Sequence, residues 1–542
     1  MKILRLRGDI AVGTVPASNP VTSRWSWLWL VIGAALLPFT SIQPSLAIAA
    51  WLAPVFLLRF ARTRRARVGI PLIALVQAIA LGINWFVGTA PSPLAVSGVV
   101  VGLLATLAYL IDRLLTPHLS GLVRTLVFPL VLTTTDWLGS WLAGLLTSWL
   151  LPSFLAAAGA WDSPGYTQAS IAPLVQLVSV TGMWGLTFLM GWFASTTNAL
   201  WEHGFDVRRT RKSLIAFGAV CGAVLIFGTI RIAAPSSEAP TVTVAAITTR
   251  EDLFATITAI NPRDLMPGTP AQRAGARLIN TPIADDLFAS TERAAREGAK
   301  IITWGETSAP TLEEDTPAMI ARAASLARQQ GIYLQVGLVV FRNTDRYPFL
   351  ENRALLLDPT GATAWDYHKA HPTPGENTVV APGPRTLPVV DTPYGRLAPA
   401  ICYDMDFPDL IRQAGQAGVD ILLAPYKDWE SIRVQHAQMA TFRAVENGFA
   451  IVRPSLSGIS TIIDAQGRVL AQADALEPGE PTAVANVTTQ RTTTLYARFG
   501  DWFAYLLVAC FAALTTATLL RRRRGSWQGS RPNYRDAIRN IP

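Results

Sequence analysis

Charged residues and cysteines are both scarce in this chain of 542 residues. Asp, Glu, Lys and Arg together make up only 15% of it, against about 25% in ordinary soluble proteins. Only three cysteines occur, which is too few for a disulfide framework. The HExxH and CxxC patterns of common metal sites are also missing. These shortages argue against a soluble enzyme, a disulfide-rich secreted domain and a zinc hydrolase.

Long apolar runs are what the sequence has in place of charge. Hydrophobic residues make up 50% of the chain, and the runs approach the roughly 20 residues that cross a bilayer. We expect about eight membrane-spanning helices, seven before residue 234 and one near the end. They are predicted at Trp25–Thr40, Leu46–Phe60, Val68–Val87, Leu94–Asp112, Thr125–Leu146, Ile171–Leu200, Leu214–Ile232 and Trp502–Leu520.

Basic clusters follow every second span, and they predict the orientation of the chain. The clusters are Arg62, Arg64, Arg65 and Arg67; Arg113 and Arg124; Arg208, Arg209, Arg211 and Lys212; and Arg521 to Arg524. Because cytoplasmic loops are enriched in Lys and Arg, this alternation places both termini in the cytoplasm. Even if the clusters are only solvated helix ends, their alternation still sets this orientation. The first apolar run begins only near Trp25, without a small-residue cleavage site, so an uncleaved anchor is expected.

The composition divides the chain into four parts. Residues 1–234 form a helical membrane domain, 235–490 a polar extracytoplasmic domain, 491–524 a last span with a basic end, and 525–542 a polar cytoplasmic tail. Within the polar domain, strand patterns alternate with helical ones, and two turns rich in Asp and Gly predict hairpins. Hairpins argue against a purely parallel doubly wound sheet.

Three reactive side chains each follow the end of a predicted strand in the polar domain. Glu306 comes after the strand at 300–304, Lys369 after 363–367, and Cys402 after 396–401. A thiol becomes a strong nucleophile when a base takes its proton, and an ammonium stabilises the anions that form. Taken singly, each residue has an ordinary interpretation, because a lone Cys is usually a small buried hydrophobe and lone charges usually lie on the surface.

The wider motifs resemble those of the nitrilase (carbon–nitrogen hydrolase) superfamily, which uses Glu, Lys and Cys in that order. The resemblance covers roughly 242–488 and rests on the segments WGE, YHKAHPTPGE and ICYDMDFPDLIRQAGQAGVDILL. It implies an αββα sandwich in which Cys402 is the nucleophile, Glu306 the general base and Lys369 the oxyanion partner. Backbone N–H near Tyr403 is implied to complete the oxyanion site.

The spans around this domain narrow the resemblance to the apolipoprotein N-acyltransferase family. That family implies a bacterial inner-membrane enzyme without cofactor or metal. A phospholipid donates its acyl chain to the thiol, and a diacylglyceryl-cysteine apolipoprotein accepts it from the thioester. We expect no nucleic-acid partner, and we expect a monomer.

The resemblance also implies supporting residues. Glu376 matches a second glutamate after the lysine, and Tyr403 and Asp404 stand where the family has Tyr-Glu. Asp428 and Trp429, in APYKDWE, are candidates for substrate binding. The ordinary interpretation of Glu376 and Asp404 is that they are loop or cap carboxylates.

Several loops depart from the family pattern. Gly305 replaces the usual Pro before the glutamate, Lys427 enters the loop from Ala424 to Glu430, and the first strand ends in Thr248-Thr249-Arg250. These loops leave the acceptor less certain than the chemistry. Apolar side chains nearby are expected to face the membrane surface or to be ordinary core residues; they are Leu253, Phe254, Leu265 and Met266.

Other functions remain open at this point. His368 and His371 flank Lys369 and raise the possibilities of a Cys–His protease or a metal site, which the lack of ligand spacing disfavours. His436 is expected to make a polar contact on a helix. The same triad would also serve a membrane-anchored amidase that hydrolyses a small C–N bond, and a non-catalytic lipid binder is the third alternative.

Overall fold

The computed structural model describes most of the chain. The described residues are 25–41, 45–88, 95–150, 160, 163–234, 240–250, 252–253, 255, 268–477, 479 and 481–529. The N-terminal segment before Trp25, the polar tail after residue 529, and Phe254, Leu265 and Met266 lie outside them.

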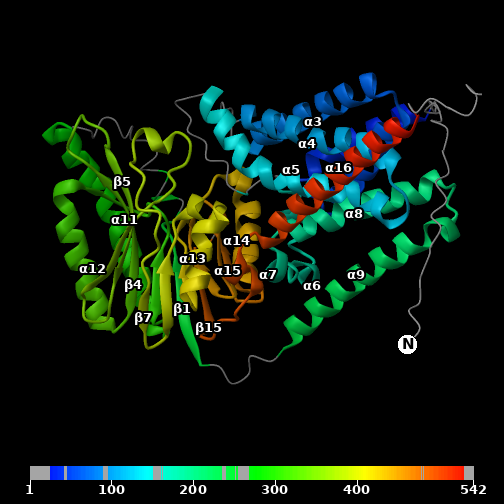
Figure 1. The fold of residues 1–542 in the computed structure, drawn as a ribbon. Coiled ribbons are helices and arrows are strands. Elements are labelled where there is room, and N and C mark those ends of the chain that lie inside the picture. Colours follow the sequence, from blue (N-terminus) through cyan, green and yellow to red (C-terminus); the bar gives the residue numbers. More distant parts are fainter. Residues whose placement is uncertain are drawn as a thin grey trace, which may run out of the picture.

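The N-terminal part is a helical bundle that the last helix of the chain rejoins (Figure 1). Its helices are α1 (Ser26–Leu36), α2 (Ala47–Thr63), α3 (Ala66–Gly88), α4 (Ala95–Leu115), α5 (Gly121–Leu150), α6 (Ala172–Val175), α7 (Val178–Thr181), α8 (Trp184–Glu202), α9 (Val207–Ala233) and α16 (Trp502–Gly529). Among the described residues, four helices (α3, α4, α9 and α16) are long and apolar enough to cross a membrane, or five if one bent pair is counted as a span. The expected number of eight spans stays a prediction.

The bent pair corrects one expectation from the sequence. The predicted continuous span Ile171–Leu200 is broken, because Ala172–Thr181 meets α8 at an angle of 115°. The bend lies at Gly182, which has φ +63° and presses against the ring of Tyr496: an added Cβ would lie 2.5 Å from that ring. Any residue with a side chain would be strained at this angle and would collide here. Hydropathy alone does not report such a turn.

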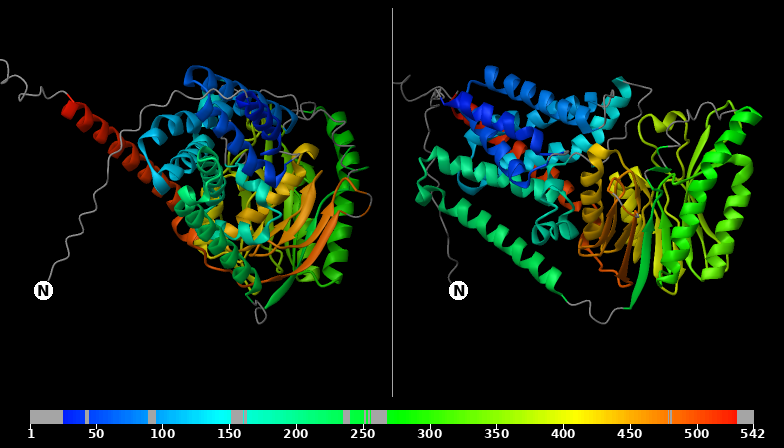
Figure 2. Two further views of the ribbon diagram at one scale, coloured as in Figure 1. Left: turned by 90° about the vertical axis from the view of Figure 1, so that its right-hand side faces the viewer. Right: turned by 180° about the vertical axis from the view of Figure 1, so that it is seen from behind.

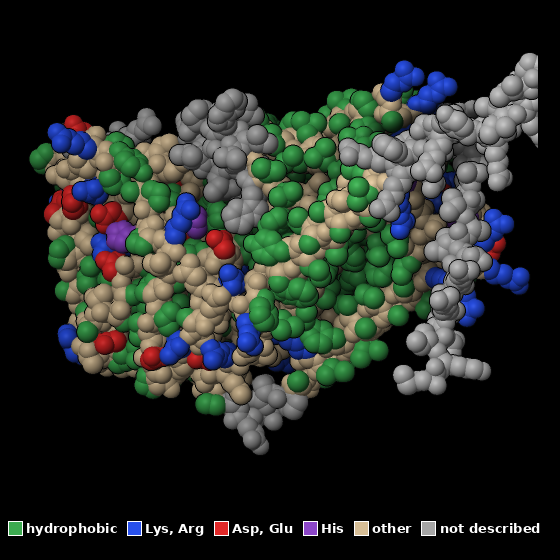
Figure 3. Space-filling view, viewed as in Figure 1, with side chains coloured by type: hydrophobic (Ala, Val, Ile, Leu, Met, Phe, Trp, Pro, Cys, Tyr) green, Lys and Arg blue, Asp and Glu red, His purple; other side chains and the backbone are tan. Residues whose placement is uncertain are grey.

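The outer surface of the bundle is apolar, and its far end is basic (Figure 3). On α9, Ile226 and Ile230 are each 63% exposed, as suits helices that face lipid. At the end away from the sheets, Arg62 pairs with Asp112 and Glu202, and Arg124 also pairs with Glu202. The helical region is therefore membrane-embedded, and these arginines lie at the end opposite the α/β domain, whereas Arg231 lies in the last turn of α9 at the other end.

Two mixed β-sheets form the α/β domain. The first has the order β15 (Thr482–Thr488), β1 (Thr241–Ile247), β2 (Ile301–Trp304), β4 (Tyr333–Phe341), β5 (Leu350–Leu357) and β6 (Thr363–His368), and β3 (Ala309–Leu312) also pairs with β4. The second has the order β14 (Val469–Asp474), β13 (Ile459–Ile463), β11 (Ala450–Arg453), β9 (Ile421–Leu423), β8 (Gly395–Pro399) and β7 (Val390–Thr392). Each sheet has a parallel centre and antiparallel edges, which confirms the prediction against a purely parallel sheet.

The two sheets stack face to face, and helices cover their outer faces (Figures 1 and 2). Val244 of β1 and Ile421 of β9 share the core between the sheets. On one outside, α11 (Pro270–Arg296) and α12 (Thr316–Gln330) bury Leu287 and Leu326 against the first sheet. On the other, α13 (Pro408–Ala417) and α14 (Arg433–Asn447) cover the second sheet. The predicted αββα sandwich is confirmed.

Helix α14 lies between the second sheet and the membrane helices, and it is buried on both sides. Its Ala440 and Ala444, one turn apart, belong to the core between the sheets and their covering helices. Phe442 and Val445 belong instead to a core that includes Trp184 of α8. The small side chains let α14 pack closely against the second sheet. The large ones on its other side fill the space between α14 and the membrane helices.

A buried polar network crosses the same interface. The Arg443 guanidinium donates to Glu446 Oε2 and to the hydroxyl of Tyr166, which lies in the short helix η3 (Pro164–Gln168) of the membrane part. Glu446 Oε1 accepts from the backbone N–H of Met183 at 3.2 Å. Arg443 and Glu446 are almost completely shielded from solvent. Each charge therefore depends on the other for compensation.

Replacing Arg443 by Met should destabilise the protein by about 3–5 kcal/mol, since it leaves the Glu446 carboxylate buried without a cation. Thermal unfolding in detergent, followed by intrinsic fluorescence, measures the effect. Arg443→Met/Glu446→Leu should recover most of the loss. The matched control is Arg322→Met, which removes an exposed pair with Asp285 and should cost less than about 1 kcal/mol. Equal stability of the two single variants would contradict this account of the interface.

Candidate active site

The loops that follow three strands bring Glu306, Lys369 and Cys402 together. Glu306 follows β2 and Lys369 follows β6, both in the first sheet, whereas Cys402 follows β8 in the second. All three side chains are at least 96% buried. The charges of Glu306 and Lys369 both act on the Cys402 thiol. The structure thus assembles the trio that the sequence predicted from separate segments.

A single ammonium joins two carboxylates at the centre of the site. Lys369 Nζ lies 2.7 Å from Glu306 Oε1 and 2.7 Å from Glu376 Oε2. The amide of Asn352, on β5, donates to both carboxylates at 2.7 Å as well. Although burial favours the neutral amine, the two carboxylates raise the pKa of Lys369 well above its ordinary value. Burial also opposes ionisation of Glu376, yet Lys369 holds the pKa of that carboxyl below its usual range.

Asn352 is a site residue that the sequence analysis missed. It occupies a buried position of β5 with 2% exposure, next to Glu306 and Glu376. The sequence signal was weak, because Asn352 stands between Glu351 and Arg353 in the polar first half of β5. Only its burial in the structure shows that it needs partners. Its partners come from loops distant in sequence, so the pattern of β5 could not name them.

Cys402 begins a tight turn, η7 (Cys402–Asp406), in a conformation rare for residues with a side chain. Its φ is +46°, and its N–H donates to Pro425 O at 2.9 Å. Sγ lies 3.7 Å from the carbonyl oxygen of Lys427. Burial and the nearby Glu306 raise the pKa of the Cys402 thiol well above its ordinary value, and Lys369 only partly offsets them. The resting thiol is therefore neutral, and it needs a base if it is to act as the predicted nucleophile.

Glu306 is placed to be that base. Its Oε1 accepts from Lys369 and Asn352, and among the described residues no donor is bonded to Oε2. Its backbone N–H donates to Tyr426 O at 3.2 Å, which ties it to the loop beside Cys402. One oxygen is therefore fixed, and the other remains for the proton of the thiol.

The residues near Glu306 that depart from the family pattern make specific backbone and side-chain contacts. Gly305 donates its N–H to Ile247 O at 2.9 Å, a bond that proline could not make. A Cβ at Gly337 on β4 would lie 1.9 Å from Gly305 O, so the backbones approach too closely for any side chain there. Thr248 and Thr249 hydrogen-bond to Ser308, at 3.3 and 3.0 Å, and secure the same loop.

Asp404 holds the nucleophile turn against the loop that carries Lys369. Its Oδ2 accepts from the Tyr367 hydroxyl at 2.8 Å and from Ile401 N at 3.0 Å. Its Oδ1 accepts from His371 N at 2.8 Å. These contacts make Asp404 a positioning residue. The adjacent Tyr403 packs edge-on against Phe407, and the oxyanion role expected for its backbone stays a prediction.

Asp428 has a similar anchoring position in the loop after the second sheet's strand β9. It is 3% exposed, lies 2.8 Å from His436 Nδ1, and accepts from Arg453 and Ser455 at 2.6 and 2.7 Å. The cations lower the pKa of its carboxyl despite burial. The neighbouring Trp429 is 48% exposed. Of the two tentative substrate-binding residues, only Trp429 presents its side chain outward, and neither role is tested.

The histidines have structural partners. His371 stacks on Phe407, with ring centroids 3.7 Å apart, and its Nδ1 lies 3.2 Å from Asp404 Oδ1. His368 lies 3.9 Å from Asp366. Across the described residues, no group of three or more His, Cys, Asp or Glu side chains is placed to hold a metal ion.

Of the apolar loop residues expected to face the membrane surface or the core, Leu253 is half-buried against the core of the first sheet.

Asp406 is a second residue that the sequence did not reveal. Its carboxylate is buried at the end of the nucleophile turn, and neither oxygen has a hydrogen-bond partner among the described residues. Burial raises the pKa of Asp406 to about 6, against the opposing charges of His436 and Arg443. Its carbonyl oxygen accepts from Ala160 N at 2.8 Å, so this turn also contacts the membrane part.

We expect Asp406→Asn to stabilise the protein above pH 6. A carboxyl whose pKa rises on folding binds extra protons in the native state, so its cost grows as the pH rises from about 4 to 6. The variant should gain about 1–3 kcal/mol at pH 8 and nothing below pH 4. Thermal unfolding at the two pH values measures this, with Asp345→Asn, an exposed site, as control. An Asp406→Asn effect independent of pH would refute it.

Alkylation of Cys402 should be slow at neutral pH and still increasing above pH 9, because burial and Glu306 raise the thiol pKa. Iodoacetamide labelling of a Cys221→Ala/Cys510→Ala background, followed by mass spectrometry, isolates this thiol. Glu306→Gln removes a negative charge while Lys369 remains, so it should move the rise to lower pH. A labelling rate that levels off below pH 8 would contradict the assignment.

Comparison with known proteins identifies a family domain and several sequence relatives. Residues 274–497 match the carbon–nitrogen hydrolase family. Apolipoprotein N-acyltransferase from Geobacter metallireducens is 28% identical over 68% of this chain and 72% of its own length. The protein of that name from Bradyrhizobium diazoefficiens is 26% identical over 67% of this chain and 70% of its own.

Among solved structures, an amidase from Nesterenkonia sp. is 21% identical, covers 50% of this chain and 98% of its own, and gives a TM-score of 0.35. The alignments with these sequence relatives are longer than the sandwich and therefore include part of the helical region, whereas the family match covers only residues 274–497. The chain is therefore a membrane-embedded acyltransferase with a carbon–nitrogen hydrolase domain, similar to the apolipoprotein N-acyltransferases.

Proposed function

We propose that the enzyme transfers an acyl chain from a phospholipid, through a thioester on Cys402, to the N-terminal amine of a diacylglyceryl-cysteine apolipoprotein. The observation that carries the proposal is the buried cluster of Cys402, Glu306, Lys369 and Glu376. It lies in a domain whose turn at Cys402 contacts the membrane part of the chain through Ala160. The names of the relatives supply the acceptor class.

In the first half-reaction, Glu306 removes the thiol proton as Cys402 Sγ attacks the ester carbonyl of the lipid. The new C–S bond forms while the carbonyl oxygen becomes an oxyanion, which the Lys369 ammonium and the backbone N–H near Tyr403 stabilise. The C–O bond then breaks, and Glu306 returns the proton to the leaving lysolipid oxygen. Glu376 keeps Lys369 charged and fixed throughout.

In the second half-reaction, the neutral amine of the acceptor attacks the thioester. Glu306 takes a proton from the nitrogen, the C–S bond breaks, and the proton passes to the Cys402 sulfur. The amide leaves, and the thiol is restored. Such ping-pong transfer needs the thioester to be shielded from water, and the burial of all three catalytic side chains supports that requirement.

We further propose that the sandwich lies on the extracytoplasmic side, with both termini in the cytoplasm. Arg62, Arg113 and Arg124 lie at helix ends remote from the sandwich, and the exposed cluster of Arg208, Arg209 and Arg211 begins α9 at that end. The positive-inside rule places such an end in the cytoplasm.

The deciding experiment incubates the detergent-purified protein with phosphatidylethanolamine and measures its intact mass. We expect a gain of one acyl chain, absent in Cys402→Ala and discharged by a diacylglyceryl peptide. Glu306→Gln should slow acylation by about 10²–10⁴-fold, since it removes the base.

Two outcomes count against the proposal. Discharge by water alone would favour the alternative amidase or hydrolase. The absence of any adduct, in protein that unfolds at the normal temperature, would remove the support for Cys402 as the nucleophile. Asp345→Asn serves as the matched control, because that carboxylate is exposed whereas the cluster is buried.

A further inference from the structure

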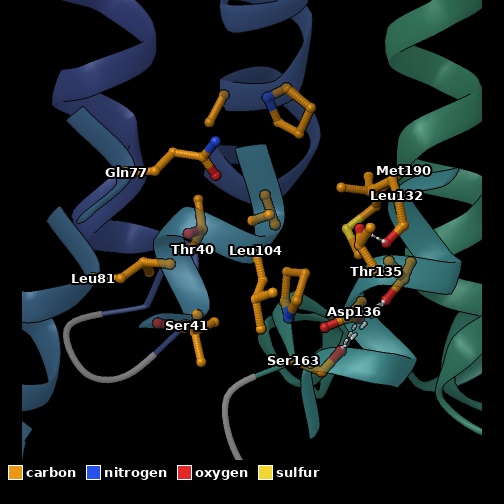
Figure 4. A pocket seen from close by; sticks show the side chains of 18 of the residues that line it. Thr40, Ser41, Gln77, Leu81, Leu104, Leu132, Thr135, Asp136, Ser163 and Met190 are labelled. Carbon is orange, nitrogen blue, oxygen red and sulfur yellow. Dashed lines mark hydrogen bonds between the residues drawn. The ribbon is translucent and has the colours of Figure 1, made fainter. Parts of the chain in front are cut away.

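A cavity lies inside the helical region, and none of the proposed catalytic side chains lines it (Figure 4). Residues of α2, α3, α4, α5, η3 and α8 line an empty volume of about 1050 Å³, part of which is open to the surroundings. Most of its wall is apolar, as at Leu81, Trp85, Leu104 and Met190. A cavity with this lining suits an alkyl chain.

One carboxylate lines this otherwise mostly apolar wall. Asp136 Oδ2 accepts from the hydroxyls of Ser163 and Thr187, both at 2.8 Å. Within the described part of the chain, no donor is bonded to Asp136 Oδ1, and no cation forms an ion pair with this residue. The side chain is only half-buried, and it belongs to the cavity lining.

The other carboxylates of the membrane part are compensated differently. Asp112 and Glu202 pair with arginines. Asp501 accepts hydrogen bonds from two tryptophans and a tyrosine, Trp137, Trp184 and Tyr496. An ionisable side chain in a membrane domain is costly and normally has a partner or a functional role. Asp136 presents its open oxygen to a cavity instead of to a protein cation.

One residue in the wall of the cavity contacts the turn that begins at Cys402. Ala160 lines the cavity, and the backbone N–H of Ala160 donates to Asp406 O at 2.8 Å. Asp406 stands four residues after Cys402 in the same turn. Ser163, which holds Asp136, lies just beyond Ala160 and lines the same part of the cavity (Figure 4). The carboxylate end of the cavity is thus the end nearest the catalytic domain.

We propose that this cavity binds an amphiphile with a primary ammonium group, whose N–H donors meet Asp136 while its alkyl chain lies along the apolar wall. A carboxylate oxygen without a donor selects a cation that carries N–H. This inference rests on the proposed function, in which two molecules carry such a group. They are the ethanolamine head group of the donor lipid and the N-terminal ammonium of the acceptor.

Binding can be measured without catalysis. Dodecylammonium and dodecyltrimethylammonium are titrated separately into the full-length Cys402→Ala protein in a non-ionic detergent, and the melting temperature is recorded. Dodecylammonium should raise it at concentrations at least tenfold lower than the trimethyl compound, which lacks N–H. Asp136→Asn, introduced into the Cys402→Ala protein, keeps an oxygen for Ser163 and Thr187 and should abolish the difference between the two amphiphiles. Asp345→Asn in the same protein should preserve that difference.

Equal responses to the two amphiphiles, or an unchanged difference in Asp136→Asn, would overturn the inference. If Asp136→Asn lowers the melting temperature of the unliganded protein, Asp136→Glu supplies the second test. This variant keeps the charge, so it should restore the preference for the primary ammonium, and failure to restore it counts against the proposal.

The half-reactions then identify the source of the ammonium. If it is the lipid head group, Asp136→Asn slows acylation of Cys402 by phosphatidylethanolamine about tenfold and leaves acylation by phosphatidylglycerol unchanged. If it is the acceptor amine, acylation is unchanged and discharge by a diacylglyceryl peptide slows about tenfold. No change in either half-reaction would refute the inference while leaving the proposed function intact. Amphiphile selectivity without any acyl-enzyme would refute the function alone.

Discussion

One buried ammonium between two carboxylates is the interaction on which the active site depends. Glu306 and Glu376 approach the same point from different loops, and without Lys369 their charges would repel each other in a medium that screens poorly. Asn352 adds a neutral bridge between the same two groups. The cation therefore both assembles the base and offsets part of the charge that opposes thiolate formation.

The sandwich fixes the distance between this cluster and the nucleophile. Asn352 lies in the first sheet, and Glu306 and Lys369 lie just beyond two of its strands. Cys402 lies just beyond a strand of the second sheet. The core between the sheets, with residues such as Val244 and Ile421, thus sets how close the base lies to the thiol. The turn at Cys402, with its positive φ, directs a strand end toward the first sheet.

The sequence predicted the parts of the site that are local in the chain. Glu306, Lys369 and Cys402 each stand at a recognisable strand end within a motif, and the three predicted strand ends lie within two residues of the observed ones. Asn352, Asp406 and Asp136 were missed because their importance comes from neighbours that lie far away in sequence. The bend at Gly182 was missed for the same reason, since the ring of Tyr496 that accompanies it lies more than 300 residues later.

Relations between domains were also beyond the sequence. Periodicity identified α14 as a helix, but a helix pattern does not tell that Phe442 contacts membrane helices while Ala440 faces a sheet. The tie from Ala160 to Asp406 is a backbone contact, so no side-chain pattern encodes it.

The double-sided burial of α14 limits how this enzyme could be dissected. A sandwich cut free of its helices would expose Phe442 and Val445 to water, together with the Arg443 and Glu446 charges that Tyr166 and Met183 now help to satisfy. Such a fragment would carry an exposed apolar surface of the kind that drives aggregation. A water-soluble version of the catalytic half would therefore need the outer side of α14 to be redesigned, with polar residues in place of its large apolar ones.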